Sequence, residues 1–221
     1  MFILLLNKFV KISFPKNTNM KIIAVGRNYV DHIKELSNEI PSSPVIFSKP
    51  DTAVLKDNEP FYYPDFSKSI HHELEIILKI NKVGKNIKEE FAHKYYDEIG
   101  LGIDFTARDL QSELKAKGLP WDLAKGFNGS APISQFVDKS KFDLSNINFH
   151  LTVNEELKQK GNTSHMMYSF DYIVSFVSKY FTLKTGDIIF TGTPAGVGEV
   201  KIGDRLKGYL EQDLMLDFEV K

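Results

Sequence analysis

The 221-residue chain contains no cysteine, so it forms no disulfide bond, offers no cysteine nucleophile and builds no thiolate metal site. It has no apolar run of the roughly 18–20 residues that a membrane-spanning helix needs. Neither charge dominates, since 28 basic residues stand against 29 acidic ones without a long block of one sign. We therefore expect neither a membrane protein nor a nucleic-acid-binding protein. The lack of cysteine suits a cytoplasmic location.

Two nucleotide-binding motifs are also missing. No G-x-G-x-x-G follows the first predicted strand, and no G-K-[ST] loop occurs anywhere. Dinucleotide and P-loop nucleotide chemistry are therefore not expected. The remaining composition is 42% hydrophobic and 26% charged, which is ordinary for a globular domain with a core of its own.

The first 19 residues differ from the rest of the chain. Residues 2–6 are apolar, but no basic segment precedes them and no small-residue cleavage site follows, as a secretory signal requires. The absence of arginine before Arg27 argues against a mitochondrial presequence. We expect residues 1–19 to be a dispensable extension from a start codon assigned too early, which the intact mass of the native protein would test. Residues 20–221 would form the working domain.

Strands dominate the predicted secondary structure. We predict strands over residues 21–25, 45–48, 71–80, 101–105, 148–154, 187–191, 205–210 and 214–220. We predict helices over residues 29–36, 87–99, 108–117 and 166–181. The regular strand–helix alternation of a doubly wound sheet is absent. The pattern therefore predicts an α+β fold of mixed sheets with a few helices.

The predicted strand over residues 71–80 carries Glu73 and Glu75, whose spacing places both carboxylates on one face. Neighbouring carboxylates repel each other, more so when buried, and a cation must then offset the repulsion. Asp104 lies in otherwise apolar sequence and also needs a partner. Hard divalent cations such as Mg²⁺ take oxygen ligands. The three residues are candidate metal ligands, although a solvated strand face explains the two glutamates equally well.

His32 and Glu35 lie three residues apart on a predicted helix, so they share a face. A glutamate that accepts a hydrogen bond from one ring nitrogen would orient the other nitrogen as a general base. A surface histidine beside a glutamate is the simpler explanation of this spacing. His71 and His72 point to opposite faces of their strand, and neither needs a functional role.

Two further segments have the chemistry to bind an anion. Lys125 lies in an aromatic and glycine-rich stretch, where its ammonium would bind a carboxylate or an oxyanion. The loop over residues 191–198 offers backbone N–H groups and the Thr193 hydroxyl. A plain structural role explains each segment when it is taken alone.

Taken together, the motifs resemble the fumarylacetoacetate hydrolase family, most closely its small single-domain acylpyruvase and oxaloacetate decarboxylase members. The matching pieces occur in the order typical of that family, from about residue 20 to the C-terminus. They are GRNYVDH at 26–32, KP at 49–50, HHELE at 71–75, GIDFTARDLQ at 102–111, KGLPW at 117–121, LAK at 123–125, GNT at 161–163 and TGTPAGVG at 191–198. Ser48 departs from the pattern, where a bulkier apolar residue is expected, and this affects the shape of the pocket.

The resemblance implies a β-rich roll with peripheral helices that is usually a homodimer and holds one divalent ion, Mg²⁺ or Mn²⁺. It implies that Glu73, Glu75 and Asp104 are the metal ligands. It further implies that His32 and Glu35 form a catalytic dyad on a mobile lid helix, with Lys125 beside them. The substrate contacts that it implies are Arg27, Asn28, Lys49, Arg108, Gln111 and Thr193.

The predicted activity is acylpyruvate hydrolysis, which cleaves the C3–C4 bond of a 2,4-dioxo acid to pyruvate and a carboxylate. His32 would take a proton from water for attack on the 4-carbonyl, and Lys125 would stabilise the oxyanion. Oxaloacetate would lose its distal carboxylate in the same site. Isomerisation of 2-hydroxyhepta-2,4-diene-1,7-dioate or 5-carboxymethyl-2-hydroxymuconate and oxaloacetate tautomerisation are alternatives. A metal- or carboxylate-binding protein without catalysis is the rival from another class.

Overall fold

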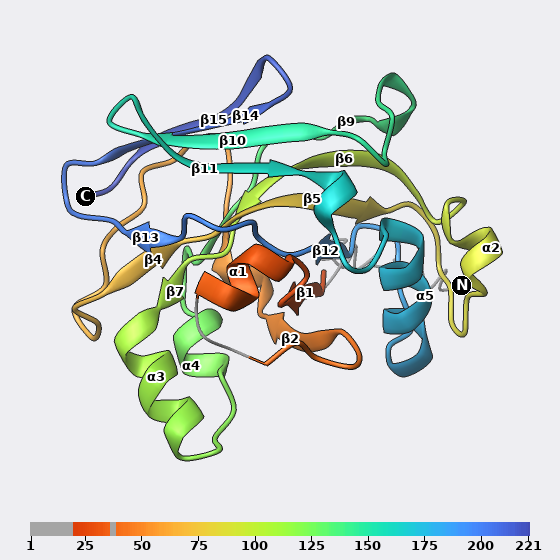
Figure 1. The fold of residues 1–221 in the computed structure, drawn as a ribbon, viewed down its shortest axis with the longest axis horizontal. Helices are drawn as coiled ribbons and strands as arrows, with labels where there is room; N and C mark the ends of the chain where they lie inside the picture. The colour runs from red at the N-terminus through yellow and green to blue at the C-terminus, as the bar shows by residue number, and fades with distance from the viewer. Residues whose placement is uncertain (1–19, 36–38) are drawn as a thin grey trace, which may run out of the picture.

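A six-stranded mixed sheet crosses the molecule in the computed structural model, which describes residues 20–35 and 39–221 (Figure 1). In spatial order its strands are β2 (Val45–Lys49), β1 (Ile22–Gly26), β12 (Ile188–Phe190), β5 (Leu74–Ile80), β6 (Tyr96–Ile103) and β9 (Val137–Asp138). Strands β1 and β12 run parallel, and the other neighbours run antiparallel. The predicted extension over residues 1–19 lies outside the described residues, as does the end of the first predicted helix at Leu36.

A four-stranded antiparallel sheet lies over β5 and β6 (Figure 1). Its strands are β11 (Glu156–Asn162), β10 (Asn148–Val153), β14 (Arg205–Leu210) and β15 (Asp213–Glu219). Two small sheets complete the strand arrangement. One consists of β13 (Gly198–Glu199), β4 (Ile70–His72) and β7 (Thr106–Ala107), and the other of β3 (Val54–Leu55) and β8 (Ala131–Pro132).

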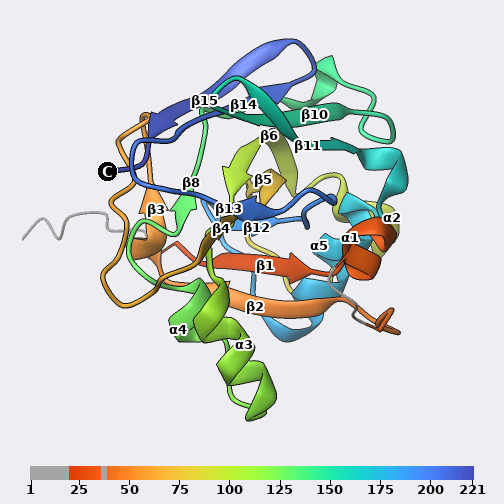
Figure 2. The ribbon, with the colours of Figure 1, turned by 60° about the vertical axis from the view of Figure 1, so that its left-hand side comes forward.

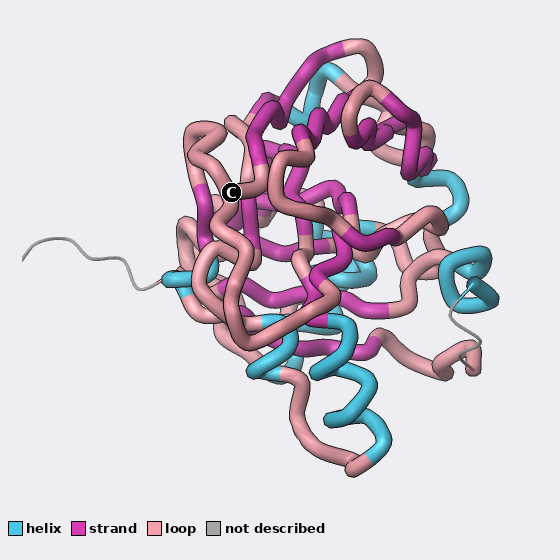
Figure 3. Tube along the Cα trace, turned by 90° about the vertical axis from the view of Figure 1, so that its left-hand side faces the viewer, coloured by secondary structure: helices cyan, strands magenta, loops and turns pink. Residues whose placement is uncertain are grey.

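The helices lie at the edges of this strand assembly (Figures 2 and 3). They are α1 (Val30–Glu35), α2 (Glu89–Ala92), α3 (Arg108–Ala116), α4 (Asp122–Lys125) and α5 (Phe170–Tyr180). Helices α3 and α4 lie together at one end, whereas α2 packs on α5 at the other. No helix in the described parts of the chain is long and apolar enough to cross a membrane. The predicted α+β architecture is confirmed.

Strand β5 separates two apolar cores. Leu74, Ile76 and Leu78 belong to the larger core, which includes residues of the four-stranded sheet. Ile77, between them in sequence, belongs to a smaller core on the opposite face, where it packs with Ile22 of β1. The side-chain alternation predicted for this strand is therefore confirmed.

The predicted continuous strand over residues 71–80 is interrupted at Glu73. Before it, β4 pairs with β7 in a small sheet, and after it, β5 pairs with β6 in the large one. The partner chain breaks at the same level, because Asp104 follows β6 and precedes β7. The Asp104 amide donates to the Glu73 carbonyl at 2.8 Å. Two adjacent strands thus change sheets together, and the change forms a corner that carries an acidic residue on each strand.

The predicted helix over residues 87–99 is wrong. Only Glu89–Ala92 is helical, and β6 begins at Tyr96. Tyr96 and Ile99 are buried and lie opposite Ile80 and Leu78 of β5. Pairing with the buried strand outweighs the local helical pattern, since strand formation depends strongly on such tertiary neighbours.

Strand β11 was not predicted, because its sequence ELKQKGN is charged and shows no alternation. The hairpin turn before β11 was the feature of the sequence from which this strand could have been predicted. Asn154 and Glu155 both adopt positive φ, 52° and 67°, as a two-residue hairpin turn requires, and asparagine favours that conformation.

Gly102 of β6 lies opposite Glu75 and leaves no room for a side chain. A Cβ there would come within 2.5 Å of the Phe190 ring and 2.9 Å of the Ile77 Cγ2. We expect Gly102→Ala to lower the free energy of unfolding by about 1–3 kcal/mol, measured by urea denaturation. Gly26→Ala in β1 is the matched control, since its Cβ would approach nothing closer than 3.8 Å. Equal destabilisation by both variants would contradict this account.

Candidate active site

Three carboxylates meet at the corner between the large sheet and the small one. Glu73, Glu75 and Asp104 each offer an oxygen within 4.8 Å of the others. Their exposed fractions are 5%, 2% and 1%. The explanation of Glu73 and Glu75 as a solvated strand face is therefore wrong, and the predicted ligand set does come together in space.

Three cationic side chains surround the acidic group. The Lys125 ammonium lies 2.8 Å from Glu73 Oε2 and 2.6 Å from Asp104 Oδ2. Lys49 is 2.7 Å from Asp104 Oδ1, and Arg108 donates to Glu73 Oε1. The charges of the three carboxylates and the three cations balance one another. This balance explains how the chain tolerates such a dense buried cluster.

The carboxyl group of Glu73 is held in its charged form. Burial would raise its pKa, because a low dielectric disfavours the carboxylate. The cations of Lys125 and Arg108 outweigh burial, and His32 adds to their effect. The pKa of Glu73 therefore lies well below its usual range.

Glu75 has the opposite electrostatic environment. Burial, and after it the neighbouring Asp104 carboxylate, raise the pKa of Glu75 well above its usual value. The Gly192 amide donates to Glu75 Oε2 at 2.6 Å and opposes this shift only in part. Glu75 is thus the carboxylate of the group that a further cation would stabilise most.

The donor set fits a hard divalent cation. All three candidate ligands are carboxylates, which suits Mg²⁺ or Mn²⁺ better than softer metals. Asp104 Oδ1 is buried and accepts no hydrogen bond, although the Lys49 ammonium lies beside it. A bound cation would use this lone-pair capacity and would relieve the repulsion at Glu75.

The predicted dyad adjoins this cluster. His32 Nδ1 lies 3.0 Å from Glu35 Oε2 on α1, and only 5% of His32 is exposed. The simpler explanation of a surface histidine is therefore wrong. A carboxylate acceptor at Nδ1 leaves Nε2 with its lone pair free to accept a proton. The loop over residues 191–198 joins the dyad to the acidic group, because its amides donate to both Glu35 and Glu75.

The backbone amides of the loop over residues 191–198 donate hydrogen bonds to side-chain carboxylates of the same chain. Its Gly192 amide donates to Glu75, and its Gly196 amide donates to Glu35 Oε1 at 2.9 Å. Both glycines have positive φ, 104° and 96°. A Cβ at Gly192 would approach the Asn28 Cβ to 2.6 Å, and one at Gly196 would collide with a carbonyl of β11. One loop therefore positions a candidate ligand and half of the dyad.

Three of the six predicted substrate contacts have buried side chains that bind neighbouring parts of the chain. The Asn28 amide donates to the Thr191 carbonyl at 2.8 Å. The Thr193 hydroxyl donates to the Leu74 carbonyl at 2.8 Å. Lys49 donates to the Ser130 carbonyl at 3.0 Å in addition to its ion pair. These residues hold the corner together, and their contact with a substrate stays a prediction.

Of the other three predicted contacts, Arg108 and Gln111 lie in the first turn of α3, and Arg27 precedes α1. Arg108 donates to Gln111 Oε1 at 2.6 Å through Nη1, whereas its buried Nε has no hydrogen-bond partner. Arg27, in the loop between β1 and α1, adopts a positive φ of 62°, which is uncommon for a side chain of this size. Strain of this kind concentrates at functional sites. Their roles toward a substrate stay predictions.

Sequence reasoning missed two polar residues of the corner. Thr106 accepts a hydrogen bond from Lys125 at 2.6 Å, and Gln159 of β11 joins His72 to Thr193. Gln159 gives no signal in the sequence, because it lies between two lysines in a charged segment. Only the irregular pairing of β11 brings it inward.

Comparison with known proteins gives consistent matches. The model of the fumarylacetoacetate (FAA) hydrolase C-terminal family matches residues 21–216. The mitochondrial oxaloacetate tautomerase FAHD1 of Bos taurus is 46% identical over 90% of this chain and 91% of that protein. The mitochondrial oxaloacetate decarboxylase of Dictyostelium discoideum is 43% identical over 92% and 94%. The structure of fumarylpyruvate hydrolase from Pseudomonas aeruginosa, in complex with Mn²⁺ and pyruvate, has a TM-score of 0.86 at 32% identity, covering 90% and 88%.

The charge distribution predicts how Glu75→Gln affects stability with and without metal. The substitution removes a carboxyl group whose charged form is disfavoured by burial and by Asp104, while the amide oxygen still accepts from Gly192. We expect the metal-free variant to gain about 1 kcal/mol or more in free energy of unfolding. We also expect Mg²⁺ or Mn²⁺ to raise its melting temperature far less than that of the wild type. Thermal denaturation in EDTA and in each metal measures both effects.

Glu98→Gln is the matched control for this experiment. Glu98 lies in β6, is partly exposed and pairs with Lys79 at 2.6 Å. Its substitution should leave the metal-dependent shift intact. A full shift in the Glu75 variant would contradict the assignment of Glu75 as a ligand.

Proposed function

Because the chain belongs to the fumarylacetoacetate hydrolase family, we propose that its acidic corner binds Mg²⁺ or Mn²⁺ and that the enzyme interconverts the keto and enol forms of oxaloacetate. One observation carries the proposal: a single loop donates hydrogen bonds to Glu75 of the buried carboxylate cluster and to Glu35, the partner of the buried His32. The tautomerase and decarboxylase relatives support oxaloacetate as the substrate. A protein that only binds a metal has no need of the dyad.

The charge balance of the corner favours a dianionic substrate. The three carboxylates are already neutralised by Lys49, Arg108 and Lys125. A divalent cation would leave the corner with two net positive charges. Oxaloacetate carries two negative charges at neutral pH, so its binding would restore the balance. This argument favours a dicarboxylate over a neutral ligand of similar size.

Tautomerisation needs only proton transfer, and the dyad supplies a group for it. Glu35 accepts from His32 Nδ1–H and so fixes the ring orientation. His32 Nε2 then removes a proton from C3 of the keto form, and the resulting imidazolium returns that proton to the 2-oxo oxygen. The reverse transfer converts the enol to the ketone. Atoms balance without a co-substrate.

Glu73, Glu75 and Asp104 would hold the metal ion. When bound, such an ion polarises the 2-oxo group and stabilises negative charge on that oxygen. Lys125 holds Glu73 and Asp104 through its ammonium and so fixes two of the ligands relative to each other. Lys49 holds the second oxygen of Asp104.

Acylpyruvate hydrolysis is the second candidate. The same His32 base would take a proton from water, and the Lys125 ammonium, already in the site, would stabilise an oxyanion at the 4-carbonyl. The C3–C4 bond would then break to give pyruvate and a carboxylate. The similarity to fumarylpyruvate hydrolase favours this activity. Oxaloacetate decarboxylation needs no attacking water and would depend less on His32.

The homodimer and the cytoplasmic location belong to the same proposal. Both come from the sequence, the first by family resemblance and the second from the lack of cysteine. Two of the relatives described above are mitochondrial by name, so cell fractionation with an antibody against the native protein tests the location. Sedimentation equilibrium of the full chain tests the dimer.

The dyad predicts a large kinetic effect of His32→Gln. We expect the turnover number for oxaloacetate tautomerisation to fall by about 10²–10⁴-fold, because the general base is lost. The dissociation constant for Mn²⁺ should stay close to that of the wild type. Loss of enol absorbance measures tautomerisation, and coupled pyruvate assays measure acetylpyruvate hydrolysis and oxaloacetate decarboxylation. Decarboxylation should fall least, and EDTA should abolish all three activities.

His150→Gln is the control histidine variant. His150 lies in β10 and stacks on Tyr209 at 4.5 Å, outside the acidic corner. It should leave all three activities unchanged. Wild-type turnover in the His32 variant would remove the dyad from the mechanism. Metal-loaded wild-type protein that converts neither oxaloacetate nor acetylpyruvate would contradict the proposed function.

Positive charge along α3 predicts that the enzyme binds dianionic substrates in preference to monoanionic ones. Arg108, Gln111 and Lys115 share one face of this helix. Burial lowers the pKa of Lys115, and the charges of Arg27 and Arg108 lower it further. We expect Lys115→Gln to raise the KM for dianionic oxaloacetate by about two- to fivefold, the size of an exposed charge interaction. The KM for monoanionic acetylpyruvate should change less.

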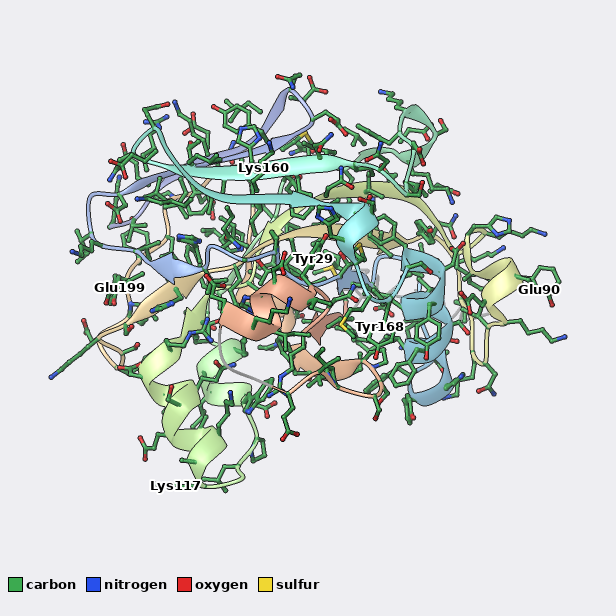
Figure 4. The ribbon with its side chains drawn as sticks, viewed as in Figure 1. Tyr29, Glu90, Lys117, Lys160, Tyr168 and Glu199 are labelled. Carbon is green, nitrogen blue, oxygen red and sulfur yellow. The ribbon has the colours of Figure 1, made fainter. Side chains whose placement is uncertain are left out.

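Lys117→Gln is the control for this charge effect. Lys117 lies at the far end of α3 and pairs with Glu113 at 2.6 Å (Figure 4). Its substitution should leave both KM values unchanged. An equal change in the two KM values of the Lys115 variant would argue against recognition of the second carboxylate.

A further inference from the structure

Gln159 lies at an irregularity in the four-stranded sheet. Gln159 is opposite Leu151 of β10, whereas Leu157 is opposite the next residue, Thr152, so Lys158 is an extra residue in β11. A β-bulge of this kind redirects the side chains that follow it. Leu157 is 58% exposed as a result, and Gln159 is only 1% exposed.

The buried amide of Gln159 makes every hydrogen bond of which it is capable. Its oxygen accepts from the Leu74 amide at 2.9 Å and lies 2.9 Å from His72 Nδ1. Its nitrogen donates to the Thr193 hydroxyl at 2.8 Å and to the Pro194 carbonyl at 3.0 Å. One side chain therefore joins the start of β5 to the loop over residues 191–198.

Two of the four hydrogen-bond partners of Gln159, Leu74 and Thr193, lead directly to the active site. Leu74 lies between the candidate ligands Glu73 and Glu75 in sequence. Thr193 lies next to Gly192, whose amide donates to Glu75 at 2.6 Å. Further along the same loop, the Gly196 amide donates to Glu35.

The loop also packs against β11 at the bulge. A Cβ at Gly196 would meet the Lys158 carbonyl, and a Cβ at Gly161 would come within 2.9 Å of the Pro194 ring. In Figure 4, Lys160, the neighbour of Gln159, lies above the helix α1 that carries the dyad. Lys160 and Tyr29, the residue before α1, also line one cavity with Pro194. The bulge in β11, the loop over residues 191–198 and α1 therefore lie next to one another.

We propose that Gln159 is a positioning residue that fixes the loop over residues 191–198 against β5. Its side-chain amide thereby positions both the candidate metal ligands and the dyad. The inference rests on the proposed function. Gln159 contacts neither the three carboxylates nor the dyad. It acts through the backbone of Leu74 and through Thr193. Its loss should therefore affect metal binding and proton transfer together.

Two substitutions separate this role from a purely structural one. Gln159→Met keeps the length of the side chain but makes none of the four hydrogen bonds. Gln159→Glu keeps an acceptor for Leu74 but loses the donors, and its carboxylate faces the Pro194 carbonyl. We expect both variants to raise the dissociation constant for Mn²⁺ by about 10–100-fold, as for residues that orient metal ligands. Isothermal titration calorimetry on the full chain measures it.

For both Gln159 variants we expect a lower turnover number for oxaloacetate with a smaller change in KM.

Ser178→Ala is the matched control for lost stability. Ser178 is fully buried in α5, accepts from the Ile87 amide at 2.8 Å and has no partner in the active site. Its substitution should lower the melting temperature and leave the Mn²⁺ dissociation constant unchanged.

A Gln159 variant with a lower melting temperature, but with wild-type Mn²⁺ affinity and turnover, would overturn the proposal. If Gln159→Met does not fold, Gln159→Glu decides the question alone, because it keeps the Leu74 hydrogen bond. The Mn²⁺ measurement needs no turnover. A wild type that binds Mn²⁺ without converting oxaloacetate would therefore contradict the proposed function, while the calorimetry would still test Gln159.

Discussion

Mutual repulsion among Glu73, Glu75 and Asp104 is the constraint on which the rest of the site depends. Three carboxylates so close together and so deeply buried would not stay charged without compensation. The chain provides it unevenly: Lys125 and the other cations contact Glu73 and Asp104, whereas Glu75 receives an amide of the loop. The uneven compensation leaves one carboxylate without a cationic partner among the described residues, and this favours metal binding at the corner over a closed salt-bridge network.

The corner exists because two paired strands change sheets at the same level. Glu73 separates β4 from β5, and Asp104 follows β6 on the neighbouring strand. Residues at such breaks are released from ladder pairing, so their side chains can converge. The loop with Gly192 and Gly196 closes this corner from one side and α1 from another. Each glycine is needed there, because its φ is positive and a Cβ would collide with a neighbour.

The chemistry of the site was more predictable than its architecture. The spacing of Glu73 and Glu75 and the apolar surroundings of Asp104 indicated a ligand set, and the spacing of His32 and Glu35 indicated a dyad. These patterns are local, but each also had a simple structural explanation, and the family resemblance was needed to favour the functional one. The double strand break, the strand character of residues 96–99 and the inward turn of Gln159 depend on pairing between segments far apart in sequence. Family resemblance joined the local patterns, but it gave no sign that Lys49 and Asn28 bind the chain itself.

The same geometry explains how one site can serve several reactions of 2-oxo acids. A divalent cation held by the acidic corner would stabilise negative charge on the 2-oxo oxygen, which tautomerisation, decarboxylation and C3–C4 cleavage would all develop. Under the proposed mechanism the reactions would differ in the role of His32, which would accept a proton from C3, remain a spectator, or accept a proton from water. Its orientation is set by Glu35, and Glu35 is held by the Gly196 amide. The Gly192 amide of the same loop holds Glu75, so one loop positions both the proposed base and a candidate metal ligand, and a movement of the loop would alter the two together.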